Sequence, residues 1–206
     1  MASESDFKHN ENERTFLRAS IYLILKDQIY DLLSSPKKQG LQQKSIRVDS
    51  YIDKDTFDVQ TRVAGLSERL LTSMDNFNHT IEEALSNRVA LSVKLEDPDM
   101  RKRSHIIVNL SLYRRDAECN VTQSQINFVE LAGSEQSLTN SEVAAQRDTT
   151  GRYFITKALG NLSRYLVRLA QGRRTQYAED ETELVSCLRS TLTPKSNILM
   201  VNCLSP

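Results

Sequence analysis

The chain has 206 residues, 39% of them hydrophobic, and its 27 basic residues balance its 27 acidic residues. This length fits one domain, or one domain with a small extension. Balanced charge gives no overall field that would draw the chain to nucleic acid or to a membrane. The three cysteines are odd in number and far apart, which disfavours a disulfide scaffold or zinc site and favours a reducing compartment. The polar start is not a signal peptide, and no apolar run reaches the roughly 20 residues that span a bilayer, so we expect a soluble, intracellular protein.

The first third of the chain predicts a disordered start and then strands. Residues 1–15 are mostly polar and charged, so we expect a disordered N-terminal segment there. Residues 17–25 form a dense apolar run with β-branched and aromatic members, typical of a buried strand. A polar break then separates this strand from a second apolar run over 29–33. Apolar and polar residues alternate over 57–63, which predicts a half-buried strand.

The middle of the chain predicts a helix followed by two strands. Ser73 is a suitable N-cap for this helix. Its expected apolar face consists of Phe77, Ile81, Ala84, Leu85 and the stem of Arg88. An alternating strand runs from Ser104 to Leu112, residues 116–124 resemble a hairpin connection, and a further apolar strand covers 126–131.

The last third predicts two helices and a final strand. Leucines at three- and four-residue spacing predict a long helix over 155–169, which Gly172 is suited to end. A shorter helix covers 184–192. The nearly continuous apolar run 197–204 is typical of a strand covered on both faces, and Cys187 and Cys203 fall at apolar positions that we assign to the core. Strands alternating with helices favour a layered α/β domain.

The run Phe128–Glu135 combines an apolar strand, a carboxylate at its end and the glycine Gly133. A P-loop nucleotidase uses this arrangement to hold a Mg²⁺-bound water and to sense a terminal phosphate through a glycine N–H. Taken alone, Glu130 is more often a hydrogen-bonded strand end than a metal ligand. The run therefore indicates an ancestry more firmly than an activity.

Four segments in order resemble a kinesin motor domain over about residues 16–206. Residues 20–33 are similar to the family's S-Y-x-E-I-Y-N-E-x-I-Y-D-L-L, and Arg103-Ser-His105 to the first switch, S-S-R-S-H. Residues 129–135 resemble the second switch, V-D-L-A-G-S-E, and 155–159 resemble I-N-K-S-L. The resemblance implies a three-layer, kinesin-type P-loop NTPase-like α/β domain with a central sheet between helices. Residues 16–206 would form a truncated motor-like domain.

The family's phosphate loop is absent from these 206 residues. All six glycines stand alone, and none precedes Lys-Ser or Lys-Thr. Without that loop the chain has no backbone N–H cradle for the β-phosphate, no lysine for the β/γ oxygens and no hydroxyl for Mg²⁺. We therefore expect no enzyme activity, no catalytic residue, no metal site and no cofactor; ATP and Mg²⁺ enter only if this is a fragment of an active motor.

The resemblance assigns six remnants of the nucleotide switches: Arg103, Ser104, His105, Glu130, Gly133 and Glu135. In the family, Arg103 and Glu135 would form the ion pair that closes the nucleotide site. Arg101-Lys102 replaces two serines that would touch Mg²⁺ and the γ-phosphate, and Glu130 replaces the Mg²⁺-facing aspartate. The resemblance also implies a packed or hydrogen-bonded role for His105, since no nucleophile and base surround it. These replacements predict a switch framework without its catalytic contents.

Kinesins bind the acidic tubulin surface with basic residues on the long helix, the next loop and the following helix. The matching candidates here are Lys157, Arg164, Arg168, Arg173 and Arg174. The following helix instead opens with four acids within residues 179–183, which would repel tubulin if they faced it. The same acids suit a helix N-terminus. We thus expect weakened microtubule binding, and a solvated helix face is the alternative.

In the family, the strand before the phosphate loop lies between the strands matching 126–131 and 197–204. Its loss leaves two apolar strands with unpaired edges, which costs several kcal/mol. Direct pairing, cover by a partner and a partial copy of a longer protein are the three possible outcomes, and we expect marginal stability.

Three functions follow from the resemblance. The first is a non-catalytic, cytoplasmic and cytoskeletal domain that binds a microtubule or another kinesin chain, with no nucleic-acid or membrane partner. The second is a fragment of a microtubule-stimulated ATPase, and the third is a decaying duplicate.

Overall fold

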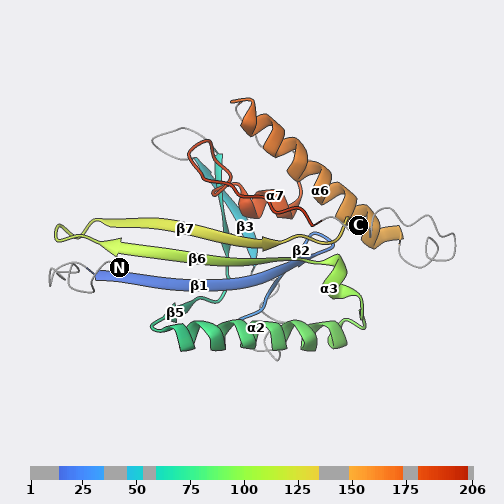
Figure 1. The fold of residues 1–206 in the computed structure, drawn as a ribbon, viewed down its shortest axis with the longest axis horizontal. Helices are drawn as coiled ribbons and strands as arrows, with labels where there is room; N and C mark the ends of the chain where they lie inside the picture. Colours follow the sequence, from blue (N-terminus) through green and yellow to red (C-terminus); the bar gives the residue numbers. More distant parts are fainter. Residues whose placement is uncertain (1–13, 35–45, 53–58, 135–148, 174–180, 204–206) are drawn as a thin grey trace.

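The structure is a computed structural model that describes residues 14–34, 46–52, 59–134, 149–173 and 181–203. Its main sheet has the strand order β2-β1-β6-β7, and β5 pairs with the same side of β1 as β2 does. Helix α2 covers one face of the sheet, and helices α6 and α7 lie on the other (Figure 1). These three layers confirm the predicted α/β domain with a sheet between helices.

The centre of the sheet consists of two long antiparallel strands. Strand β1 (Arg14–Leu25) pairs along its length with β6 (His105–Arg115). On the far side of β1 lie the short strands β2 (Gln28–Asp31) and β5 (Arg69–Leu71). Alternate residues of β1 enter two different cores: Ile21 and Leu23 pack beneath α2, whereas Tyr22 and Ile24 pack beneath α6 and α7. The dense apolar run therefore forms the buried strand that the sequence predicted, and both of its faces are covered.

Tight turns fix the register of this sheet. Lys26 and Asp27 join β1 to β2, and both have positive φ (54° and 55°), as a two-residue hairpin of type I′ requires. Residues 116–120 join β6 to β7 (Val121–Glu130), so β7 begins earlier than the predicted connection allowed. The β6–β7 register is continuous from Arg115↔Val121 to Ile106↔Glu130.

Helix α2 (Met74–Lys94) begins as predicted at Ser73, whose side chain accepts a hydrogen bond from the Asn76 N–H. The residues that it buries are Thr80, Ala84, Arg88 and Leu91. Leu85 was predicted to belong to the apolar face, but this is wrong because its side chain is 48% exposed. The buried stripe is centred on Ala84 and Arg88, and Leu85 lies one residue, or about 100° around the helix, beyond it.

The opposite face carries α6 (Thr149–Ala170) and α7 (Glu183–Leu188). Gly172 ends α6 with φ of 65°, and the N–H groups of Gly172 and Arg173 donate to the carbonyls of Leu169 and Arg168. A second small sheet of β3 (Arg47–Ile52) and β4 (Val59–Ala64) stands beside α7. Its Thr61 hydroxyl donates to the Ser186 carbonyl and fastens β4 to α7.

The C-terminal segment contradicts the prediction of a buried strand over 197–204. Residues 197–203 form no helix or strand, and Leu199 is 89% exposed. Cys203 is also exposed, so its assignment to the core is wrong, whereas Cys187 is buried as predicted. The physical reason is the missing partner: no described strand pairs with this segment to accept its backbone hydrogen bonds.

Candidate functional site

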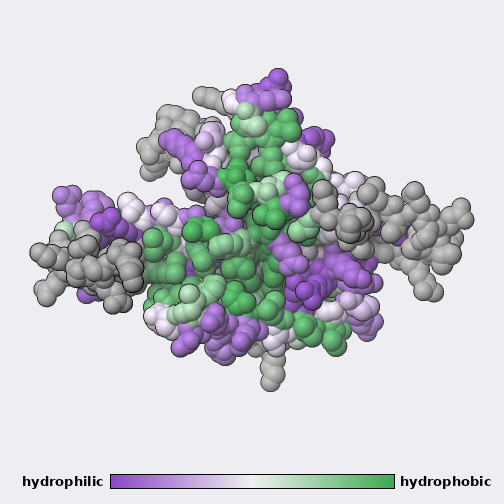
Figure 2. Space-filling view, in the orientation of Figure 1, coloured by the Kyte–Doolittle hydropathy of each residue, from purple (hydrophilic) through white to green (hydrophobic). Residues whose placement is uncertain are grey.

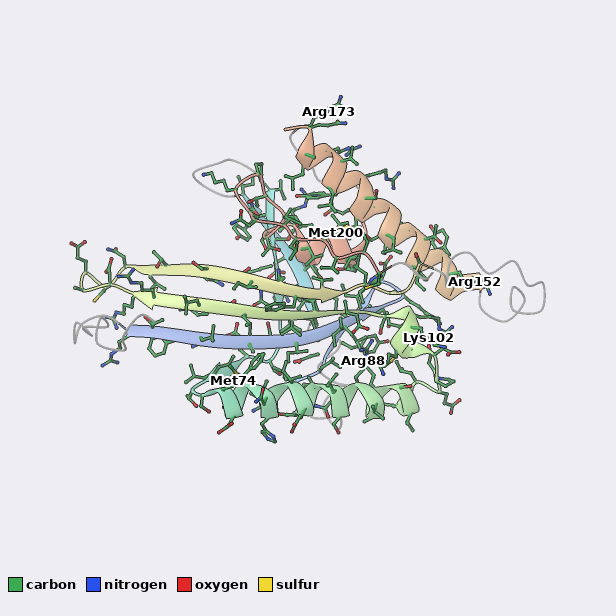
Figure 3. The ribbon with its side chains drawn as sticks, viewed as in Figure 1. Met74, Arg88, Lys102, Arg152, Arg173 and Met200 are labelled. Carbon is green, nitrogen blue, oxygen red and sulfur yellow. The ribbon has the colours of Figure 1, made fainter. Side chains whose placement is uncertain are left out.

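The two switch-like segments meet at one end of the sheet. Strands β6 and β7 are antiparallel, so the start of β6 lies beside the end of β7, with Ile106 opposite Glu130. The short helix α3 (Met100–Arg103) leads into β6, and residues 131–134 leave β7 at the same place. Figure 3 labels Arg88 of α2 and Lys102 of α3 at this end. The topology thus brings together five of the six predicted switch remnants, all except Glu135, which lies outside the described residues.

Arg88 is the central charge of this site, and the sequence indicated only its stem. Its side chain is 7% exposed, and a guanidinium nitrogen lies 3.5 Å from a carboxylate oxygen of Glu130. The same guanidinium donates to the Arg101 carbonyl (3.0 Å) and the Ser104 hydroxyl (3.2 Å). One buried cation therefore connects α2 to both switch-like segments. A buried arginine among apolar helix positions was the signal in the sequence, because a buried charge must have partners.

Arg103 is held by a neighbour that the sequence analysis did not consider. Its guanidinium donates to the carboxylate of Asp97, in the loop before α3, and both side chains are largely buried. The predicted partner, Glu135, lies outside the described residues, so the Arg103–Glu135 ion pair stays a prediction. In the described part of the chain, Arg103 instead anchors the loop that leads into the first switch-like segment.

His105 and Gly133 link the two segments through hydrogen bonds. The buried Nδ1 of His105 accepts a hydrogen bond from the Ala132 N–H at 3.0 Å. Burial lowers the pKa of His105 to about 4, so the ring is neutral at physiological pH. The Gly133 N–H donates to the Lys102 carbonyl at 3.2 Å. The glycine N–H that would face a terminal phosphate in a nucleotidase is therefore bonded within the protein here.

The described residues of this site do not suit a magnesium ion. Mg²⁺ is held by oxygen ligands, often carboxylates, and by waters. Here the Glu130 carboxylate faces the Arg88 guanidinium, and the carboxylates of Asp97 and Asp99 pair with Arg103 and Lys102. The cations Arg101 and Lys102 stand where the family has serines. Among the residues that the structure describes, no three His, Cys, Asp or Glu side chains are grouped as metal ligands. The arrangement can hold two segments together, and it offers no donor set for a metal-bound phosphate.

The basic candidates on α6 occupy different environments. Arg164 and Arg168 are exposed one helical turn apart, and Arg173 is exposed just beyond the helix (Figure 3). Lys157 is half-buried and close enough to Asp27 to lower the pKa of that carboxyl. Arg174 lies outside the described residues. The exposed arginines remain available to a partner, whereas Lys157 faces an internal acid.

Two of the acids before and within α7 point into the protein. Glu181 forms an ion pair with Arg189 in which both side chains are nearly fully buried, and Arg189 also stacks over the Tyr165 ring at 5.3 Å. Glu183 lies beside Asp27. Its pKa is raised mainly by burial and, to a smaller extent, by the negative charge of Asp27. Long-range partners thus turn Glu181 and Glu183 inward, so these two acids do not belong to an outward-facing acidic cluster.

Comparisons with known proteins identify the family of this fold. The chain is an α/β domain with a central sheet between helices, and the family model "Kinesin motor domain" matches residues 3–206. It belongs to the kinesin motor domain family. Kinesin heavy chain of Drosophila melanogaster is 26% identical over 92% of this chain and 18% of its own length. Human kinesin heavy chain isoform 5A is 24% identical over 97% of this chain and 18% of its own length.

Solved structures show the same fold over part of their length. The C-terminal motor and motor homology domain of Kar3Vik1 gives a TM-score of 0.66 at 21% identity, covering 90% of this chain and 45% of that one. A fast kinesin gives 0.64 at 20% identity, covering 87% and 47%. The chain thus spans under a fifth of these curated relatives and under half of these solved chains. None of its described helices is long and apolar enough to cross a membrane.

Proposed function

We propose that this chain is a non-catalytic, kinesin-like motor-homology domain that acts in the cytoskeleton by binding a microtubule or a partner motor chain. The observation that carries the proposal is the bonding within the switch-like site. Glu130 faces the buried Arg88, and the Gly133 N–H is bonded to the Lys102 carbonyl. The groups that would respond to a nucleotide are thus used to join the two segments.

The chemistry of phosphoryl transfer supports this proposal. Such catalysis depends on positioned cations and N–H donors around the phosphates, and removing one such donor can lower a rate by roughly 10²–10³. The 206 residues contain no Gly-Lys-Ser or Gly-Lys-Thr sequence that would supply the main cradle. The two switch-like segments are hydrogen-bonded to each other within the protein. Such an arrangement suits a domain that keeps one conformation and acts by binding.

Helix α6 supplies the surface that suits an acidic filament. It contains Arg152, Lys157, Arg164 and Arg168 and no acidic residue. Tubulin presents the acidic surface to kinesins, so exposed arginines on this helix favour binding through charge attraction. The inward orientation of Glu181 and Glu183 removes part of the repulsion that the sequence predicted. We therefore assign the filament contact to Arg164, Arg168 and Arg173.

A partner motor chain is the second form of the same proposal. The solved Kar3Vik1 structure contains a motor and a motor homology domain fused to a synthetic heterodimeric coiled coil. That structure is a precedent for a domain of this fold placed beside a motor. The precedent rests on fold alone, because identity is 21%.

Co-sedimentation with microtubules across a range of salt concentrations tests the filament contact. The double variant Arg164→Glu/Arg168→Glu should lose most of the binding, and binding by the unmodified chain should weaken as salt rises. The matched control is Arg47→Glu/Arg62→Glu, which makes the same charge change on the exposed β3–β4 hairpin. Equal loss in both variants, or no sedimentation at all, would reject the α6 contact.

A fragment of an active microtubule-stimulated ATPase remains the alternative function. This chain covers under half of each of the two solved chains. A phosphate loop could therefore lie in the part of such a protein that these 206 residues do not include, which favours the alternative. Calorimetry with ATP on protein that includes any sequence flanking these 206 residues separates the two functions. Micromolar affinity for ATP would reject the non-catalytic proposal, and absence of heat with intact microtubule binding would support it.

A further inference from the structure

We propose that an uncovered face of the sheet, at the end of β1, β6 and β7 nearest the β6–β7 turn, binds single-stranded nucleic acid. Arginines on this face would contact phosphates, and an exposed aromatic ring would stack on a base. We call this surface the arginine–aromatic face, and it consists of Arg14, Phe16, Arg18, Tyr113, Arg115 and Gln123. The inference goes beyond the proposed function and does not depend on microtubule binding.

The strand register places these six side chains on one side of the sheet. Tyr22 of β1 and Ile107 of β6 pack beneath α6 and α7, and residues an even number of positions away along each strand share that side. Phe16 is directly opposite Tyr113, and Tyr113 is directly opposite Gln123. The arginine–aromatic face is therefore a continuation of the side of the sheet that α6 and α7 cover.

The cover ends before it reaches this part of the sheet. The Asn127 amide of β7 donates to the hydroxyl of Thr191, just after α7, at 2.8 Å. Nearer the β6–β7 turn, Arg14 and Arg115 are exposed and Phe16 is 41% exposed. Figure 1 shows the three strands extending past α6 and α7 at this end, and Figure 2 shows hydrophilic residues at the turn and hydrophobic residues gathered in the middle of the molecule. The face is therefore open to a partner.

Arginines make this face locally positive, although the chain as a whole has balanced charge. Arg14 and Arg115 are directly opposite each other on β1 and β6, a placement in which like charges repel. Within the described chain, neither of them forms an ion pair, and Glu130 at the far end of β7 is the only acidic residue of the three strands. Arg18 has one acidic partner, Glu68, at 2.8 Å, and both side chains are about half-exposed. A bound anion would relieve the repulsion between the opposed arginines.

Two aromatic rings lie between these charges, and one of them is held in place by its neighbours. The Arg18 guanidinium lies over the Tyr113 ring, 5.4 Å from its centroid, and the Gln123 amide donates to the Tyr113 hydroxyl at 3.3 Å. Phe16, directly opposite Tyr113, supplies the more open ring. Aromatic side chains stack on any nucleobase because every base has a π-face, and the RRM domain uses the aromatic residues of a sheet face to stack two or three bases.

A single strand of nucleic acid suits this face better than an acidic peptide or a duplex does. An acidic peptide would pair with the arginines but would have no flat group to stack on Phe16. A duplex keeps its bases stacked on one another, so it would offer mainly phosphates to this surface. A single strand presents phosphates, flat bases and base edges together, and the Gln123 amide can bond to a base edge. RNA and single-stranded DNA share this chemistry and differ in the 2′-hydroxyl.

Fluorescence anisotropy with a labelled single-stranded RNA of about eight nucleotides tests the face. We expect saturable binding to the 206-residue chain, and log K should fall with log salt with a slope of about −2 for three arginine contacts. Single-stranded DNA of the same sequence should also bind, and its difference from RNA measures the contribution of the 2′-hydroxyl. Absence of saturation at low salt, or equal binding of duplex RNA or of an oligoglutamate peptide of the same charge, would overturn the proposal.

Variants of Phe16 test the stacking contact. Phe16→Leu keeps an apolar side chain but removes the ring, so it should weaken RNA binding at least about fivefold, whereas Phe16→Trp should bind at least as tightly as the unmodified chain. The matched control Tyr51→Leu removes a ring that is 48% exposed on the β3–β4 hairpin and should leave binding unchanged. Thermal unfolding confirms that each variant is folded. Unchanged binding by Phe16→Leu, or an equal loss in Tyr51→Leu, would contradict stacking on this face.

Charge variants locate the phosphate contacts. Arg14→Gln/Arg115→Gln should weaken RNA binding and reduce the salt slope by about 1.4, because two phosphate contacts are lost. The control Arg47→Gln/Arg62→Gln makes the same charge change on the β3–β4 hairpin and should keep the slope. The microtubule variant Arg164→Glu/Arg168→Glu should keep the RNA slope as well. An equal reduction of the slope in either of these two variants would place the RNA elsewhere and overturn the proposal.

Discussion

Strands β6 and β7 are neighbours in one sheet, and both contain apolar residues at alternate positions, but their side chains lie in opposite environments. At the start of β6, Ile107 is fully buried between β1 and β7 and beneath α6 and α7. On β7, Ile126 is 59% exposed and Phe128 is 58% exposed. The helices cover the centre of the sheet and leave much of β7 open (Figure 1). An apolar strand pattern thus predicts a strand, and its position in the sheet decides how far it is buried.

The same contrast applies to the contacts that the two strands make. The start of β6 lies beside Arg88 and contributes His105, and both side chains are hydrogen-bonded within the chain. The outer edge of β7 has no described strand paired with it. Substitutions on the two strands therefore test whether their difference in burial is also a difference in stability.

The largest expected effect comes from one substitution made on each strand. Ile107→Ala should lower the free energy of unfolding by about 2–5 kcal/mol, because it removes buried methyl groups and leaves a cavity. Ile126→Ala on β7 should cost under about 1 kcal/mol, because most of that side chain is already in water. Urea denaturation of both variants checks this difference. Equal losses would mean that β7 is covered in solution.

The next effect compares two ion pairs, one buried in the protein and one exposed at its surface. Glu181→Gln should cost about 3 kcal/mol, because Arg189 would keep its charge in a nearly fully buried position. The matched change Glu68→Gln breaks the half-exposed pair with Arg18 and should cost at most about 1 kcal/mol. Thermal unfolding of both variants in the same buffer measures the difference. A larger loss for Glu68→Gln would contradict the buried role of Glu181.

Local interactions explain the parts of the fold that the sequence predicted. Ser73 caps α2 through its own side chain, Gly172 ends α6 through its backbone conformation, and the polar break at 26–28 contains the β1–β2 turn. Each of these depends on residues a few positions apart. The four family-like segments, taken in order, likewise indicated the family, because the residues of each segment are contiguous.

Long-range neighbours explain the parts that the sequence did not predict. Residues 197–203 have the composition of a buried strand, but no described strand pairs with them. Arg88 meets Glu130 across 42 positions, and no local pattern specifies that pair. Glu181 was interpreted as a surface acid because Arg189 and the Tyr165 ring approach it only in the folded chain. Burial and charge pairing at the site are therefore properties of the assembled layers.

The third effect is a pH dependence at the switch-like site. Burial lowers the pKa of His105 to about 4, below the ordinary value of 6.5, so the unfolded chain binds the proton more tightly. Stability from this group is present above pH 6.5 and is lost as the pH falls towards 4. We expect a loss of about 2 kcal/mol between pH 7 and pH 5 from this histidine.

His105→Asn should remove that part of the pH dependence, and urea denaturation at several pH values measures it. The matched control is His79→Asn, which changes an exposed histidine on α2 and should leave the slope as it is. A wild-type slope retained in His105→Asn would assign the pH dependence to other groups.

The smallest effect compares an aspartate in the β1–β2 turn with one in the β6–β7 turn. Burial raises the pKa of Asp27, between β1 and β2, although Lys157 and the Glu183 N–H oppose the rise. A raised pKa means that the folded chain binds the proton more tightly, so stability falls as the pH rises above the ordinary carboxyl range. Asp27→Asn should therefore raise stability slightly at pH 7, by under about 1 kcal/mol because the group is half-exposed. Asparagine also tolerates the positive φ at this position.

Asp116, in the β6–β7 turn, provides the comparison of opposite sign. Hydrogen bonds from the side chain and backbone of Asn120 lower its pKa, so its stabilising contribution is present at pH 7 and is lost as the pH falls through its lowered pKa. Asp116→Asn should consequently lower stability at neutral pH, and this loss should vanish in acid. Thermal unfolding of both variants at pH 7 and pH 3 measures the two signs. The same sign for both at pH 7 would show that burial of the Asp27 carboxylate and hydrogen bonding of the Asp116 carboxylate do not control the stability of these turns.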